Sequence, residues 1–258
     1  SGVATSNKTK LGLQVQPGIQ ADLGITYEER VEQAFNTSGS RLGIVKGRNQ
    51  ADSSDASFTT GTGAIGSDAA LNPATMSDFL SWLASNPAAQ MLESSPACPI
   101  VMAGGSSNPT STPSLTNGCG LNQTVSLGTV SAPRIVYVRG DPNAGSRFAA
   151  LTVSQAIEGA GILIVENGDL QQQGALRWDG LVLVTGPSVS AAFRSGSMTT
   201  IYGALAGLAS RPDQPDGLFA LFMDDGLDFR VRSSKQNVDM VQRMLALHTI
   251  LSWRESQR

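Results

Sequence analysis

The second half of the chain is a series of short apolar runs separated by glycine, proline, aspartate or asparagine. The runs are "RIVYV" (134–138), "GILIV" (161–165), "GLVLV" (180–184), "TIYGALAG" (200–207) and "GLFALF" (217–222). Short runs of this kind, bounded by turn-forming residues, are typical of buried strands. Counted from Ile162, Leu181, Ile201 and Leu218, the last four runs recur at 19, 20 and 17 residues. A nearly fixed period predicts stacked repeats.

Each repeat pairs an apolar strand with a more polar one, such as "DLQQQG" or "SVSAAF". One such unit cannot bury its apolar side alone, whereas stacked units form a continuous interior. The pattern therefore predicts a β-solenoid or a strongly coiled β-sheet, with a meander of strands as the alternative.

The repeated stretch "GAGILIVENGDLQQQGALRWDGLVLVTG" (159–186) assigns positions within these units. Its glycines are expected at corners between rungs. An inward ladder is expected from Ile162, Ile164, Leu181, Leu183 and Ile201. The segment Arg177, Trp178 and Asp179 is expected in a connecting corner.

Three helices are expected from capping residues and apolar spacing. The first is "ITYEERVEQAF" (25–35), capped by Thr26. The second follows Thr75 and ends near Asn86-Pro87, with Met76, Phe79, Leu80 and Leu83 on one side and with Trp82 expected as a packed aromatic. The third begins after Ser233 or Ser234 and should cover an open end or a face of the β region, through the stripe Val238, Val241, Leu245 and Thr249.

Segments 47–73 and 94–130 are rich in Ser, Gly, Pro or Thr and are expected to be loops. The predicted fold class is therefore α+β. A helical, loop-rich N-terminal region (1–130) precedes a C-terminal β-solenoid-like or coiled β-sheet region (131–258), which is sealed by the last helix.

The two cysteines, Cys98 and Cys119, bracket "CPIVMAGGSSNPTSTPSLTNGC" with no histidine nearby to complete a metal site. We expect a disulfide, which implies an oxidising, exported location. Two buried thiols are the alternative.

Composition and charge limit the partners of the chain. The formal net charge is -3, so no global cationic field attracts nucleic acid or anionic membranes. No apolar run approaches the roughly 20 residues that span a bilayer.

Candidate chemistry in the sequence is sparse, and no cofactor is expected. The single histidine, His248, lies in the last predicted helix without a catalytic partner. The aspartates Asp224, Asp225 and Asp228 surround a glycine and are a weak calcium candidate that departs from the EF-hand pattern. The alternative from another functional class is a glycan-active β-helical enzyme. Its candidate catalytic carboxylates are Glu166, Asp169 and Asp179. Candidate nucleic-acid contacts are Arg134, Arg139, Arg147, Arg177 and Arg194.

The order of "PRIVYVRG", the repeated stretch 159–186, "IYGALAG" and the final "ILSWRE" resembles the C-terminal half of PilX-like pilus-assembly proteins, which are minor-pilin-type components of type IV pilus systems. The resemblance covers residues 132–255. It implies an exported subunit whose soluble domain is displayed on or at the tip of a pilus. Large pilin-like proteins of the ComZ type are similar, with a β-solenoid and a link to DNA uptake.

The family resemblance sets the functional expectation. We expect a non-enzymatic pilin-like surface protein that acts in pilus assembly, adhesion or DNA capture, with a purely structural surface protein as a further alternative. Expected partners are other pilin or minor pilin subunits, together with DNA or a surface ligand. Membrane contact is expected only through an N-terminal anchor helix, which the opening "SGVATSNKTK" does not supply.

Overall fold

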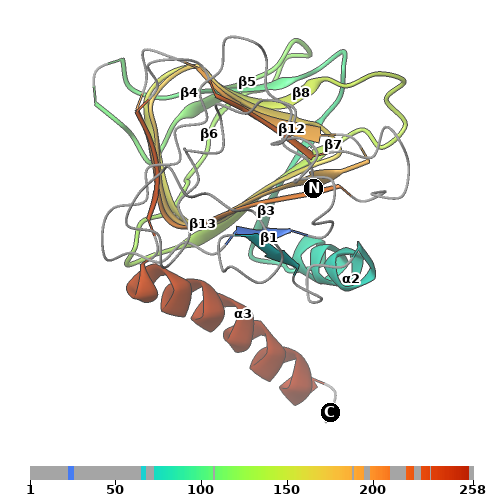
Figure 1. Ribbon diagram of the computed structural model, residues 1–258, viewed down its shortest axis with the longest axis vertical. Helices are drawn as coiled ribbons and strands as arrows, with labels where there is room; N and C mark the ends of the chain where they lie inside the picture. The colour runs from blue at the N-terminus through green and yellow to red at the C-terminus, as the bar shows by residue number, and fades with distance from the viewer. Residues whose placement is uncertain are drawn as a thin grey trace.

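A computed structural model of the protein describes residues 23–25, 65–67, 73–106, 108–187, 189–194, 198–209, 219–223, 228–232 and 234–255. Most of this part of the chain is β-structure, wound into a β-solenoid of about three turns. Seen along the stack, the solenoid has a three-sided cross-section (Figure 1). The prediction of a β-solenoid is therefore confirmed.

Two sheets build the solenoid. The first sheet contains, in spatial order, β15 (Asp228–Arg232), β13 (Met198–Ala209), β11 (Leu176–Gly186), β9 (Ile157–Glu166), β7 (Arg134–Gly140) and β3 (Ala89–Ser94). The second sheet contains β14 (Phe219–Met223), β12 (Val189–Phe193), β10 (Asp169–Gln172), β8 (Ala149–Val153), β4 (Ile100–Ala103), β5 (Ser114–Thr116) and β6 (Asn122–Thr124). All neighbours pair in parallel except β4 with β5 and β5 with β6, which are antiparallel. Two short strands outside the solenoid, β1 (Leu23–Ile25) and β2 (Ile65–Ser67), pair in parallel with each other.

The repeat seen in the sequence corresponds to one turn of the solenoid. Ile162 and Leu181 are direct partners on the adjacent strands β9 and β11. The next step is longer than expected, because Leu181 pairs with Ala204 while Ile201 pairs with Trp178. Ile201 therefore belongs to a different ladder from the one predicted.

The three long strands β9, β11 and β13 bend at a column of glycines, so that each forms two sides of the triangle (Figure 1). Gly161, Gly180 and Gly203 are in register and have φ angles of 118°, 139° and 148°. A Cβ atom on Gly180 would come within 2.1 Å of the Gly161 carbonyl oxygen, and one on Gly203 equally close to the Gly180 oxygen. Only glycine combines these φ angles with such close backbone approach.

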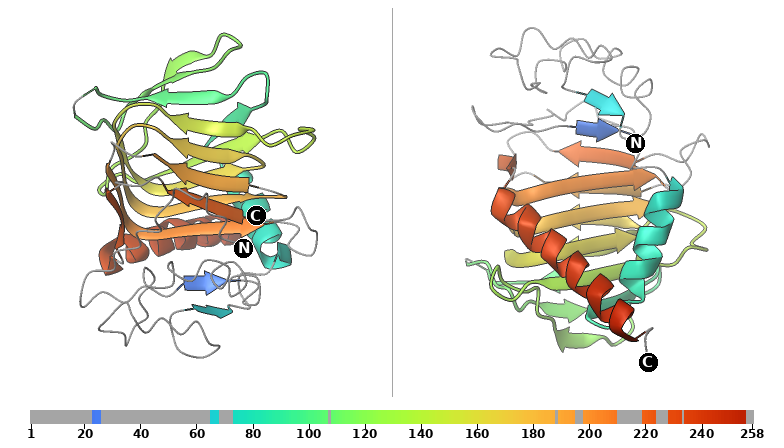
Figure 2. Two further views of the ribbon diagram at one scale, coloured as in Figure 1. Left: turned by 45° about the horizontal axis from the view of Figure 1, so that its top comes forward. Right: turned by 90° about the horizontal axis from the view of Figure 1, so that it is seen from below.

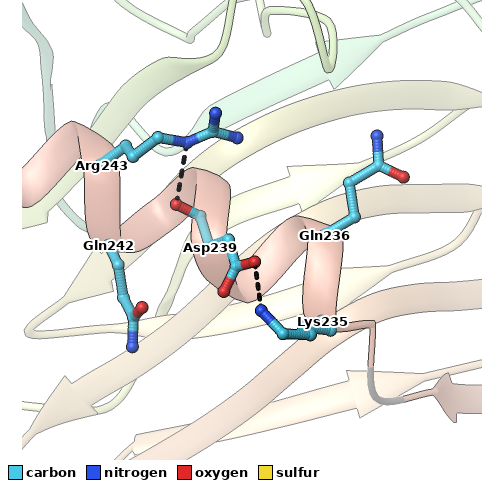
Figure 3. Close-up of a pocket in the computed structure, with 5 residues that line it drawn as sticks. All are labelled: Lys235, Gln236, Asp239, Gln242 and Arg243. Carbon is cyan, nitrogen blue, oxygen red and sulfur yellow. Dashed lines mark hydrogen bonds and ion pairs between the residues drawn. The ribbon is translucent and has the colours of Figure 1, made fainter.

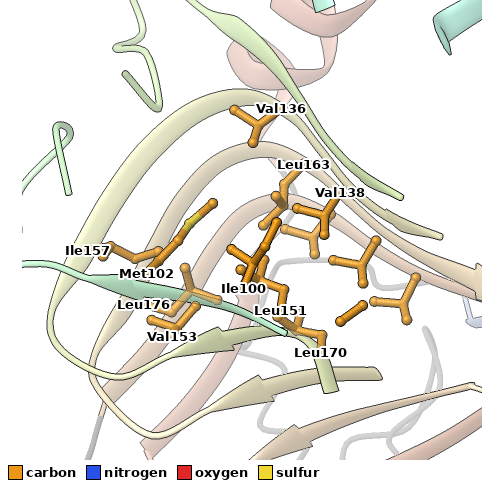
Figure 4. Packing of buried hydrophobic residues seen from close by; sticks show 14 of the residues in the cluster. Ile100, Met102, Val136, Val138, Leu151, Val153, Ile157, Leu163, Leu170 and Leu176 are labelled. Atoms are coloured by element: carbon orange, nitrogen blue, oxygen red, sulfur yellow. The ribbon is translucent and has the colours of Figure 1, made fainter. Parts of the chain in front are cut away.

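Two hydrophobic clusters occupy the two faces of the first sheet. One of them fills the interior of the solenoid and includes Leu163, Val165, Val182 and Val184. Figure 4 shows part of this cluster, with Leu163, Val136 and Val138 among the labelled residues. The outer cluster contains Ile162, Ile164 and Leu183 with the partly buried Leu181. The predicted inward ladder was therefore wrong in its facing: these four residues point outward. Strands covered on both faces have no polar alternation from which the sequence could reveal the inner side.

The predicted corner at 177–179 was also wrong, because these residues lie within β11. Trp178 is fully buried in the interior cluster, and its Nε1 donates to the Gly161 carbonyl oxygen at 3.2 Å. Its neighbours Arg177 and Asp179 therefore face outward, since side chains alternate along a strand.

Two helices cover the outer face of the first sheet (Figure 2). Helix α2 (Pro73–Ala84) starts two residues before the predicted cap Thr75, because proline suits the first helical position. Phe79, Leu80 and Leu83 pack in the outer cluster as predicted. Trp82 lies beside them, with its ring stacked on Phe79 at a centroid distance of 6.3 Å.

Helix α3 (Lys235–Glu255) lies across β9, β11 and β13 and covers a face rather than an end of the solenoid. Ser234 caps it as predicted, since its Oγ accepts from the Asn237 amide at 3.3 Å. Val241 and Leu245 join the outer cluster as the predicted stripe requires, whereas Val238, also predicted in the stripe, is 39% exposed and is not part of that cluster. Thr249 lies in the part of α3 whose side chains are not described.

The predicted α+β class with a helical, loop-rich N-terminal region was wrong for the described residues, which are mostly strands with two helices. Segment 94–130, expected to be a loop, contains β4, β5 and β6. Its short apolar pieces form strands because they pair with neighbouring rungs, a tertiary effect that local composition hides. The pairings β3 with β7 and β4 with β8 cross the expected boundary between residues 130 and 131. The predicted helix at 25–35 lies outside the described residues, apart from the last residue of β1.

Candidate functional site

The predicted disulfide is present between Cys98 and Cys119. It joins the turn between β3 and β4 to the turn between β5 and β6. Disulfides form and persist in oxidising compartments, so this bond indicates an exported location. None of the described helices is long and apolar enough to cross a membrane.

The five arginines considered for nucleic-acid contact occupy different positions around the turn. Arg134 opens β7 beside the Gly161 bend, and Arg139 lies near the other end of β7. Arg147 precedes β8, Arg177 lies near the start of β11, and Arg194 follows β12. The structure therefore does not bring the five onto one face.

Ion pairs with acids of the scaffold are formed by Arg139, Arg147 and Arg177. Arg139 lies 3.7 Å from Glu93 and 3.5 Å from Glu166, its partners on the two neighbouring strands. Arg147 lies 3.1 Å from Asp169. Such partly exposed ion pairs contribute little to stability, and they reduce the local excess of positive charge.

The three carboxylates of the glycan-enzyme alternative are held by separate structural contacts. Glu166 accepts a hydrogen bond from the Tyr137 hydroxyl at 2.9 Å. Burial, followed by the charge and hydrogen bond of Glu166, raises the pKa of the Tyr137 phenol. Asp169 accepts from the Ser190 amide at 2.6 Å. Asp179, near the opposite end of the strands from Glu166, accepts from Asn237.

A polar cluster on the outer face brings together residues from β11, β13, β15 and α3. We call it the Tyr202 cluster, and it consists of Arg177, Asp179, Tyr202, Arg232 and Asn237. The guanidinium carbons of Arg177 and Arg232 lie 5.7 and 6.0 Å from the centre of the Tyr202 ring. Both distances fall within the range of cation–π attraction.

Asn237 connects the Tyr202 cluster to helix α3. Its Nδ2 donates to Asp179 Oδ1 at 2.8 Å and to the Tyr202 carbonyl oxygen at 2.7 Å. The side chain is only 4% exposed. Asp179 also lies 3.7 Å from the guanidinium group of Arg177. The arrangement provides fixed nitrogen donors beside a half-buried aromatic ring.

Sequence reasoning identified Arg177 but missed Tyr202 and Arg232 as its neighbours. Arg230 and Arg232 alternate with apolar residues in "DFRVR", which is the pattern of a half-exposed strand. Arg230 stands in register with Thr200, which in turn pairs with Arg177. Arg177 and Arg232 are far apart in sequence, so whether they meet depends on the number of residues in each solenoid turn between them. The repeat period alone does not give these lengths.

An open pocket follows the polar side of α3 and is lined by Lys235, Gln236, Asp239, Gln242 and Arg243 (Figure 3). Lys235 Nζ lies 2.6 Å from Asp239 Oδ2, and Arg243 Nε donates to the Asp239 carbonyl oxygen at 3.2 Å. Because all five residues belong to one helix and its charges pair within it, this surface resembles a solvated helix side.

Some of the predicted site residues lie outside the described residues or have side chains that are not described. Asp224 and Asp225 are outside the described residues, and Asp228 opens β15 with a side chain that is not described. His248 lies in α3, again without a described side chain. The calcium hypothesis therefore stays a prediction.

Comparison of the chain with protein-family models, curated proteins and solved structures finds no match. The resemblance to PilX-like pilus proteins therefore stays a prediction from the quoted sequence motifs.

Proposed function

We propose that the chain is a non-enzymatic, exported domain of a pilin-like subunit in a type IV pilus system, where it acts by binding. The observation that carries the proposal is the position of the resembling residues. "PRIVYVRG" and the repeated stretch 159–186 form β7, β9, β10 and β11, which lie in consecutive turns of the solenoid. The resemblance therefore follows one continuous structural unit rather than scattered segments.

The disulfide supports the same proposal. An extracellular subunit works in an oxidising compartment, where the Cys98–Cys119 bond persists. The repeat architecture agrees as well, because stacked rungs form a rigid body with long side faces, which suits display and binding. Expected partners are other pilin or minor pilin subunits.

A glycan-active enzyme is less well supported by the geometry. Hydrolysis of a glycosidic bond requires two carboxyl groups flanking the bond. Glu166, Asp169 and Asp179 instead bond Tyr137, the Ser190 amide and Asn237. The hydrogen bonds of the three considered carboxylates are thus made with residues of the scaffold.

Deletion of the gene in its source organism tests the proposal. We expect fewer pili by electron microscopy, or normal pili with impaired adhesion or DNA uptake. Complementation with the unchanged gene should restore the wild-type behaviour. A strain with unchanged pilus number, adhesion and DNA uptake would contradict a role in the pilus system.

DNA capture is a second candidate role, favoured by the two guanidinium groups at Tyr202. Arginines beside an aromatic side chain are a common surface for nucleic-acid backbones and bases. Within the Tyr202 cluster, Asp179 is the one carboxylate, and it forms an ion pair with Arg177. The local charge of this cluster is positive although the net charge of the chain is -3.

Salt-dependent retention of DNA tests this second role. We expect Arg177→Gln with Arg232→Gln to weaken retention and to reduce its salt dependence. The matched control is Arg134→Gln with Arg194→Gln, which removes the same charge elsewhere. Equal losses in the two double variants would argue for general charge rather than for the Tyr202 cluster.

A further inference from the structure

One end of the solenoid is closed by a segment that does not follow the parallel winding. Strand β5 runs antiparallel along β4, and β6 runs antiparallel along β5. In Figure 2 these strands lie at the end of the stack opposite the C-terminal strands. We call residues 111–127 the end cap.

The end cap supplies apolar side chains to the interior of the first turn. Leu115, Val125 and Leu127 are fully buried and belong to the interior cluster. The backbone closes on itself beside them, since the Val125 amide donates to Pro113 at 3.0 Å and the Leu127 amide donates to Ser111 at 2.8 Å. Release of the cap would therefore expose the interior of the first turn.

The cap replaces an apolar edge with a polar one. Strand β4, with the sequence "IVMA", has no charged or polar side chain. Strand β6, with the sequence "NQT", is exposed at all three residues and is the terminal strand among those described in its sheet. Short polar edge strands resist pairing with other chains, whereas an uncharged apolar edge favours it. Without the cap, β4 would become such an edge.

The Cys98–Cys119 disulfide joins the cap to the rung that it covers. Cys98 lies two residues before β4, and Cys119 lies in the turn between β5 and β6. The ladder between β4 and β5 is only three residue pairs long. Cys119 is exposed and Cys98 is half-buried, so the bond is accessible to a small thiol. When the short ladder between β4 and β5 opens, the disulfide still limits how far the end cap can move from β4, because it closes the loop between the two cysteines.

We propose that the disulfide controls the end cap, and that its reduction releases residues 111–127 and lets a second copy of the chain pair along β4. A dithiol reductant supplies two electrons: its first thiolate attacks one cysteine sulfur and releases the other cysteine, its second thiolate attacks the resulting mixed disulfide and releases the remaining cysteine, and the reductant leaves as its own disulfide. Both cysteines end as thiols. The exposed β4 then pairs antiparallel with β4 of a second copy, the direction that it already uses with β5 and the one that a two-fold dimer requires.

Hydrogen exchange and oligomeric state of the full chain test the proposal, with dithiothreitol as the reductant. In the reduced protein, amides within 111–127 should exchange at least about tenfold faster, while those of β9 and β11 keep their protection. Light scattering should show monomer before reduction and dimer after it. Cys98→Ser with Cys119→Ser should reproduce both results without reductant, and reductant should not change this variant further.

A charge on β4 separates edge pairing from general stickiness. Val101 is partly exposed on β4, and Val101→Lys should keep the reduced protein monomeric while the cap still exchanges rapidly. Unchanged exchange in 111–127 after reduction would overturn the proposal. So would equal acceleration across β9 and β11, which would mean global unfolding, or dimerisation that persists with Val101→Lys.

Discussion

The ring of Trp178 occupies the space that a side chain on Gly159 would need. A Cβ atom on Gly159 would lie 2.3 Å from Trp178 Cζ3, and the two residues are partners on β9 and β11. Trp178 in turn donates to the carbonyl oxygen of Gly161. The two glycines of "GAG" therefore serve different purposes: the first admits the indole ring, and the second permits the bend.

Gly159→Ala should lower the free energy of unfolding by about 2 kcal/mol, because the added methyl group overpacks the interior against Trp178. In a Trp178→Leu background the same substitution should have a smaller effect, since the smaller side chain leaves room. Urea unfolding of the four proteins in this double-mutant cycle measures the difference. Equal effects in both backgrounds would mean that the two residues do not compete for space.

Gly180→Ala should be more damaging, because its φ of 139° and its approach to the Gly161 oxygen both exclude a Cβ atom. We expect a loss of about 3 kcal/mol or more. Gly145→Ala is the matched control, since nothing lies within 4 Å of its added Cβ. If the two variants unfold at the same urea concentration, the glycine column is not required for the bend.

The sequence predicted the winding of the chain but not which side of each strand faces inward. The 19-residue step from Ile162 to Leu181 located two adjacent rungs correctly. The runs "GILIV" and "GLVLV" do not indicate which side chains face the interior, because every residue after the glycine in each run is apolar. The outer cluster exists because α2 and α3 cover that face, and the choice of covered face depends on the whole fold.

The Tyr202 cluster shows a second limit of sequence reasoning. Arg177 could be singled out as a cation, yet Arg232 is brought to the same ring by three strands in register. The disulfide was predictable, because Cys98 and Cys119 are the two cysteines of the chain and lie in one turn-rich segment. The strands that it links were hidden, since β5 and β6 are three residues long and mostly polar.

Substitutions at two adjacent residues of β11 test the facing of the strands. Val182 is fully buried in the interior, whereas Leu181 is only partly buried on the outer face. Val182→Asn should lower the free energy of unfolding by about 3 kcal/mol, because a polar amide is buried without a partner. Leu181→Asn should lower it by about 1 kcal/mol. The reverse order in urea unfolding would place Leu181 inside.

Asn237→Ala should loosen the attachment of α3 to the solenoid. The substitution removes the Nδ2 group that donates to Asp179 and to the Tyr202 carbonyl oxygen. We expect the free energy of unfolding to fall by about 2 kcal/mol. Gln236→Ala, on the exposed side of the same turn, should be nearly neutral. Hydrogen exchange should be faster in α3 of Asn237→Ala but not in that of Gln236→Ala. Identical exchange in the two variants would remove Asn237 from this role.

Tyr137 should make stability sensitive to alkaline pH. Its pKa is raised in the folded state by burial and by Glu166, whereas an unfolded tyrosine has a pKa of about 10. The stabilisation is therefore present below about pH 10 and is lost as the pH rises above it, because only the unfolded chain releases the proton there. Urea unfolding between about pH 9 and 11 should show a steeper loss for the wild type than for Tyr137→Phe. Parallel curves would contradict the raised pKa.

The pilus proposal is tested most directly by quantitative mass spectrometry of sheared, purified pili from the source organism. The account predicts peptides of this chain together with the major pilin, and their loss from the same fraction of a strain that cannot assemble pili. An equal amount of the chain in the sheared fractions of piliated and non-piliated strains would contradict it.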